Sequence, residues 1–119
     1  MAEQVLFASA SRTATSSSPV VNGNRCKALV VVIDVTAITA TPSVVFTVEV
    51  VDSLSGKFPA VLTSAAVTAT GTTVLTIGQG VTAVANVSSG QAVPENVRVT
   101  ATHGDADAIT YTVSCHKIR

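Results

Sequence analysis

The chain has 119 residues, equal numbers of acidic and basic side chains, and a charged fraction of only 12% against 47% apolar residues. This balance excludes an intrinsically disordered protein, and no apolar run is long enough for a membrane-spanning helix. The chain has no basic excess to hold a phosphate backbone, and aromatic residues make up 3% with no Trp. Stacking platforms for bases or sugars are therefore scarce. We expect one domain, or one domain plus a tail, with neither a nucleic acid nor a membrane as partner.

The composition favours β-structure. The sequence holds 22 Val, 17 Thr and 5 Ile, so more than a third of it is β-branched. We expect a core of Val and Ala rather than of large aromatic side chains. Because each small side chain contributes less on burial, such a fold gains from covering further surface against copies of itself or a partner.

Residues 1–24 differ from the rest and predict an extended N-terminal arm or an edge strand. The apolar triplet Val5-Leu6-Phe7 is followed by a small polar stretch from Ser9 to Ser18. The start of the chain has no basic segment and no apolar run of signal-peptide length. We therefore expect synthesis in a cytoplasm.

From Lys27 the apolar pattern has a period of 2, which predicts strands. The first strand ends before Thr41-Pro42, and a second follows it up to Val51. The side chains expected to face inward on these two strands are Leu29, Val31, Ile33, Val35, Val44, Phe46, Val48 and Val50.

Turn residues punctuate the middle of the chain. Asp52–Lys57 predicts a hairpin loop, and Pro59 places the following strand, with Phe58, Ala60 and Leu62 on one face, at a sheet edge or a bulge. A turn at 68–71 precedes a strand at 73–77. Residues 81–94 predict a long connection, with room for one helical turn.

Two strands with strict alternation close the chain, separated by a turn at His103–Asp107. Their expected inward side chains are Val97, Val99, Ala101, Ile109, Tyr111, Val113 and Cys115. Seven or eight short strands at this spacing predict an all-β fold: an antiparallel β-sandwich, jelly-roll-like, spanning residues 25–119.

The sequence contains few candidate metal-binding or catalytic residues. His103, Asp105 and Asp107 could hold a cation, but Gly104 and the aspartates favour a plain turn. His116 and Cys115 are neighbours on a strand and point to opposite faces, so they are poorly placed as a base and a nucleophile. We expect no enzyme, no catalytic residue, no metal and no cofactor.

The two cysteines, Cys26 and Cys115, form no metal or redox motif. In a reducing compartment we expect two free thiols. The alternative is a disulfide between them, which requires that the first and last core strands pair.

Partner contacts are expected from the arm and from basic residues near it. The basic pairs Arg25 with Lys27 and Lys117 with Arg119 are expected at the two ends of the sandwich, either solvated or against an acidic protein surface. The partner-contact residues we expect are Val5, Leu6, Phe7, Arg12, Arg25 and Lys27.

Several valines fall on strand faces that should meet solvent. Adjacent apolar side chains of this kind form a patch, and patches mark interaction sites. The alternative is that these positions face the opposite sheet. They are Val30, Val32, Val45, Val51, Val61 and Val74.

Four stretches resemble small β-rich virion structural proteins of tailed bacteriophages. They are Val32–Ser43, Ser55–Lys57, Thr68–Leu75 and Val97–Val113, within about residues 30–114. The arm does not match. The resemblance implies a capsid decoration (cement) protein on the capsid surface, made in the host bacterial cytoplasm.

Such proteins bind the major capsid protein as oligomers, commonly trimers, and secure the joints between capsomers. The resemblance also admits a tail-tube, head–tail connector or other tail structural protein. A receptor-binding module is the third interpretation, and the shortage of aromatic residues speaks against it.

Overall fold

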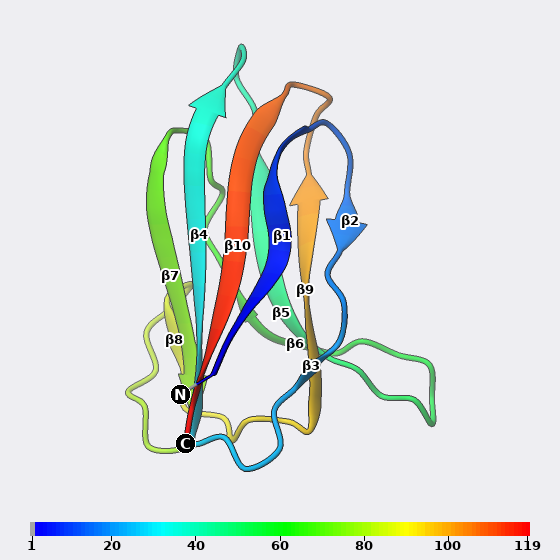
Figure 1. Ribbon diagram of the computed structural model, residues 1–119, viewed down its shortest axis with the longest axis vertical. Coiled ribbons are helices and arrows are strands. Elements are labelled where there is room, and N and C mark those ends of the chain that lie inside the picture. The colour runs from blue at the N-terminus through cyan, green and yellow to red at the C-terminus, as the bar shows by residue number, and fades with distance from the viewer. Residues whose placement is uncertain (1) are drawn as a thin grey trace.

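The computed structural model describes residues 2–119, and Met1 lies outside the described range. Across residues 2–119 the chain forms ten strands in two sheets, which pack as a β-sandwich (Figure 1). The first sheet has the order β1-β10-β4-β7-β8, and the second has β2-β9-β5-β6 with β3 also paired to β9. Every pairing is antiparallel except that of β7 with β8. The strands are Ala2–Arg12 (β1), Ser16–Ser17 (β2), Val21–Asn22 (β3), Ala28–Ile38 (β4), Val44–Val50 (β5), Ala60–Thr63 (β6), Gly71–Gly78 (β7), Ser88–Ser89 (β8), Asn96–His103 (β9) and Ile109–Ile118 (β10).

The predicted all-β sandwich is confirmed, and the alternation of side chains explains it. All the inward positions predicted on β4, β9 and β10 are buried, as are those on β5 except Val50, which is half-buried. The described residues contain no helix, and hence none long and apolar enough to cross a membrane.

The core differs from the expected mixture of Val and Ala. From residue 3 onward Ala101 is the one buried alanine, and Leu and Ile side chains accompany the valines. Three aromatic rings meet in the middle of the core. Tyr111 packs edge-on against Phe7 at 5.9 Å and against Phe46 at 5.2 Å between ring centroids. Three of the four aromatic residues are thus concentrated where they bury most area.

The extended arm predicted for residues 1–24 is corrected by the structure, which favours the edge-strand alternative. From residue 2 onward this segment belongs to the sandwich, because β1 pairs with β10 along its whole length. Two register shifts, on either side of Phe7, allow Leu6 and Phe7 both to be buried. The chain then crosses to the second sheet, where β2 and β3 pair with β9.

The predicted loops are largely confirmed. Asp52–Lys57 joins β5 to β6 as a hairpin loop, and β6 is an edge strand with a register shift one residue beyond Ala60. Phe58 lies outside the strand and is exposed, contrary to its expected place on a strand face. Residues 81–94 form the predicted long connection, which carries the short strand β8 in place of a helical turn.

Candidate interaction surfaces

The expected contact residues of the N-terminal segment divide between core and surface. Leu6 and Phe7 are 6% and 5% exposed, so both are committed to the protein's own core. Val5, on the other hand, is 58% exposed. Arg12 lies half-buried with its guanidinium carbon 5.1 Å from the centre of the Phe7 ring, and it donates to the carbonyl oxygen of Ala8 at 2.6 Å. Of these four residues, Val5 is the one free to contact a partner.

The two basic pairs lie at one end of the sandwich rather than at opposite ends. β4 begins where its antiparallel neighbour β10 ends, and the Lys27 amide donates to the Ile118 carbonyl at 2.7 Å. This pairing places Arg25, Lys117 and Arg119 around an open pocket of about 490 Å³, whereas Lys27 lies outside its lining. The pocket is lined by Asn22, Asn24, Arg25, Lys117 and Arg119. This basic end suits contact with an acidic protein surface.

The cluster at His103–Asp107 forms the predicted turn. The Asp105 carboxylate accepts the Asp107 amide at 3.1 Å, and Asp107 accepts the Thr41 amide across the loop. The described residues bring no three metal-ligating side chains together. His103 bonds the Tyr111 hydroxyl at 3.1 Å, and burial is the main cause that lowers the pKa of His103. Its ring fixes β9 to β10.

Burial suppresses the reactivity of one of the two cysteines, Cys115. Cys26 and Cys115 are both free thiols. Burial raises the pKa of Cys115 to about 11, so its thiol stays protonated at neutral pH and is a poor nucleophile. Cys115 faces the core while His116 lies on the outer face, 3.9 Å from the Glu3 carboxylate. The predicted separation of this pair is confirmed.

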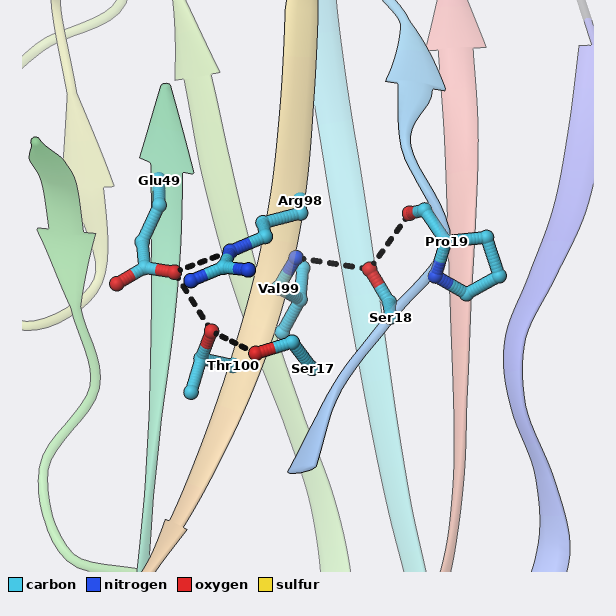
Figure 2. Close-up of polar contacts among 7 residues, drawn as sticks. All are labelled: Ser17, Ser18, Pro19, Glu49, Arg98, Val99 and Thr100. Atoms are coloured by element: carbon cyan, nitrogen blue, oxygen red, sulfur yellow. Dashed lines mark hydrogen bonds and ion pairs between the residues drawn. The ribbon is translucent and has the colours of Figure 1, made fainter. Parts of the chain in front are cut away.

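A polar cluster covers the outer face of the second sheet (Figure 2). Arg98 donates from Nε to Glu49 Oε1 at 2.9 Å, and Thr100 donates to the same oxygen at 2.6 Å. The hydroxyls of Thr100 and Ser17 are 2.8 Å apart, and since the Thr100 proton is already used, Ser17 is the donor. The Phe58 ring stacks on the guanidinium at 3.4 Å. These contacts bind β2 and β5 to β9.

A buried hydroxyl completes this second sheet. Ser18 accepts the Val99 amide at 2.9 Å and donates to the Pro19 carbonyl at 2.9 Å, as Figure 2 also shows. Ser18 therefore replaces a missing backbone partner where β2 has ended. The cluster holds β2, β5 and β9 together.

The outer face of the first sheet carries a row of uncharged side chains. Val5 pairs with Ser114, Ser114 with Val32, and Val32 with Val74, so these four residues form a row across β1, β10, β4 and β7. Val74 is 45% exposed. None of the row is charged. We name it the valine row.

The valines predicted to face solvent do so in part. Val74 is exposed, and Val30 and Val32 on the first sheet and Val45 and Val51 on or beside the second are half-buried outside the core. Val61 is half-buried and packs against the core, so the alternative holds at that position.

Sequence reasoning missed two apolar features. Leu54 is exposed at the β5–β6 hairpin loop, and a pocket of about 480 Å³ lies beside the β6–β7 connection. A signal for the pocket was present, because the chain carries no Asp, Glu, Lys, Arg or His from Phe58 to Pro94. A charge-free run of this length marks a surface with few ionic contacts.

The chain was compared with protein-family models, curated proteins and solved structures, and none of them matches it.

Proposed function

We propose that this chain is a virion structural protein of a tailed bacteriophage, and specifically a capsid decoration protein. It is made in the host bacterial cytoplasm, binds the major capsid protein on the outer shell and stabilises the joints between capsomers. It works by binding alone, as a homo-oligomer, for which the resemblance implies a trimer. The observation that carries the proposal is the valine row, four uncharged residues that run side by side across four strands.

The strand order supports the jelly-roll-like part of the proposal. With β2 and β3 counted as one strand and the short β8 left out, the eight strands run 1-8-3-6 in one sheet and 2-7-4-5 in the other. In this order the first strand lies beside the last, and successive strands change sheet except at the β5–β6 hairpin, as in two Greek keys. Jelly rolls are a common architecture of capsid proteins.

The energetics favour binding through the valine row. Covering the exposed parts of Val5 and Val74 stabilises a contact by about 1 kcal/mol each. No charged group in the row has to lose its hydration. A gain this small per copy becomes large on a shell, because many copies bind at once.

Particles of the encoding phage, made with and without this gene, test the proposal on heating. We expect the genome-release temperature to fall when the protein is absent and to recover when purified protein is added back. An unchanged release temperature would contradict the decoration role. Recovery of the protein with isolated tails would instead support a tail structural protein.

Point variants identify the face that binds. Val74→Glu should fail to restore the release temperature, because it places a charge in the valine row. Thr102→Glu adds the same charge to the exposed face of the second sheet and should restore it fully. Deleting the N-terminal segment is unsuitable as a test, since Leu6 and Phe7 belong to the core.

A further inference from the structure

The β5–β6 hairpin loop, Asp52–Lys57, presents a leucine that the fold itself does not use. Leu54 is 98% exposed, whereas the other exposed large apolar side chains of residues 2–119 reach at most 58%. In Figure 1 this loop projects beyond the body of the sandwich. Because the Leu54 side chain makes almost no contact within its own chain, a partner that covers it would bury nearly all of its apolar area.

Hydrogen bonds within the loop hold it in shape. Asp52 accepts the Leu54 amide at 3.1 Å and the Ser55 hydroxyl at 2.7 Å, and Gly56 donates to the Asp52 carbonyl at 2.9 Å. The Ser55 hydroxyl is the main cause that lowers the pKa of Asp52. Gly56 has φ +71°, which most residues adopt with strain. Leu54 is therefore presented in an ordered loop, so little entropy is lost on binding.

A pocket without charged lining residues lies elsewhere on the same chain. Its volume of about 480 Å³ leaves room for the tip of a hairpin loop. Every lining residue falls in the charge-free run, and Asn86, whose amide is held by the Thr63 carbonyl at 2.9 Å, is one of the few polar ones. The lining residues are Ala65, Ala66, Val67, Thr68, Ala69, Thr73, Ala85, Asn86 and Val87. We name it the uncharged pocket.

Within one copy the loop and the pocket point away from each other. In Figure 1 the loop extends on the side of the sandwich opposite β7 and β8. The uncharged pocket includes Thr73 of β7 and the residues directly before β8. Leu54 can therefore reach this pocket only on a second copy.

From this complementarity we infer that Leu54 of one copy inserts into the uncharged pocket of the next. The contact is head-to-tail, since each copy uses a different surface on each side. Such contacts close into a ring where the rotation between copies permits it. This inference deepens the proposed function, because it names the surfaces through which the copies of the oligomer meet.

Sedimentation of the purified chain tests the contact with two variants at exposed positions. Leu54→Asp removes the inserted side chain, and Ala66→Asp places a charge in the pocket. Each should weaken self-association by about 10- to 100-fold, the effect of losing one buried leucine. Ser53→Asp adds the same charge beside Leu54, keeps the leucine and should associate as the unmodified chain does. Melting curves confirm that each variant is folded.

Mixing the two variants is the decisive step. The Leu54→Asp chain keeps an intact pocket, and the Ala66→Asp chain keeps an intact loop, so the mixture has one productive contact. We expect a one-to-one pair that grows no further. A mixture that stays monomeric, a Leu54→Asp chain that associates normally, or an unmodified chain that is monomeric would each overturn the inference. The heated-particle assay is separate, so either idea can fail while the other stands.

Discussion

Replacing Phe7 by alanine tests whether the N-terminal segment is part of the fold. Phe7 is 5% exposed and packs edge-on against Tyr111 at 5.9 Å. Truncating a buried phenylalanine costs about 3–5 kcal/mol, out of a total stability of about 5–15 kcal/mol for a domain. For a chain of this length, 1 kcal/mol corresponds to about 4 °C in Tm. We therefore expect Phe7→Ala to lower Tm by about 15 °C.

Thermal melting followed by circular dichroism measures this loss on the isolated chain. Val5→Ala is the matched control, because it truncates an exposed side chain on the same strand and should cost about 0.5 kcal/mol or less. Equal, small effects of Phe7→Ala and Val5→Ala would refute the reasoning. Residues 2–12 would then be an arm that packs only on a partner.

Three further predictions concern buried polar groups and thiols. Ser18→Ala leaves a buried amide of β9 without a partner and should lower the free energy of unfolding, measured by chemical denaturation, by about 1–3 kcal/mol. Ser17→Ala, at an exposed position, should lower it by less than about 0.5 kcal/mol. Equal losses would contradict this prediction. The pKa of His103 is lower in the folded than in the unfolded chain, so the stability of the fold should fall as pH drops from about 6.5 through the folded pKa. If the Tm of a His103→Gln chain falls as steeply over the same pH range, His103 is not the cause. At pH 8 a thiol reagent should modify Cys26 but not Cys115 in the folded protein, and fast labelling that survives Cys26→Ser would contradict this.

The strands of the sandwich could be predicted because their side chains alternate without interruption. On β9 and β10 each inward residue is apolar, and Tyr111 falls in register with its neighbours at the centre of the core. These two loops could also be predicted, since Asp52–Lys57 and His103–Asp107 contain the residues that their turns need. In these strands and loops the local sequence was sufficient to predict the backbone structure.

For the N-terminal segment the sequence left an arm and an edge strand as alternatives, because the register shifts of β1 break the alternation. Leu6 and Phe7 are neighbours and are both buried, which a regular strand does not allow. Its small polar residues also gave no sign that β10 would pair with it. The meeting of Arg25 with Lys117 at one end was missed for a related reason. It depends on which strands are neighbours, and strand order is a property of the whole fold.

Cryo-electron microscopy of intact phage particles tests the central claim most directly, because it locates the protein and shows which face binds. The account predicts density for the sandwich on the outer capsid surface, over the joints between capsomers, with the valine row against the shell. Density in the tail, or the outer face of the second sheet against the shell, would contradict it.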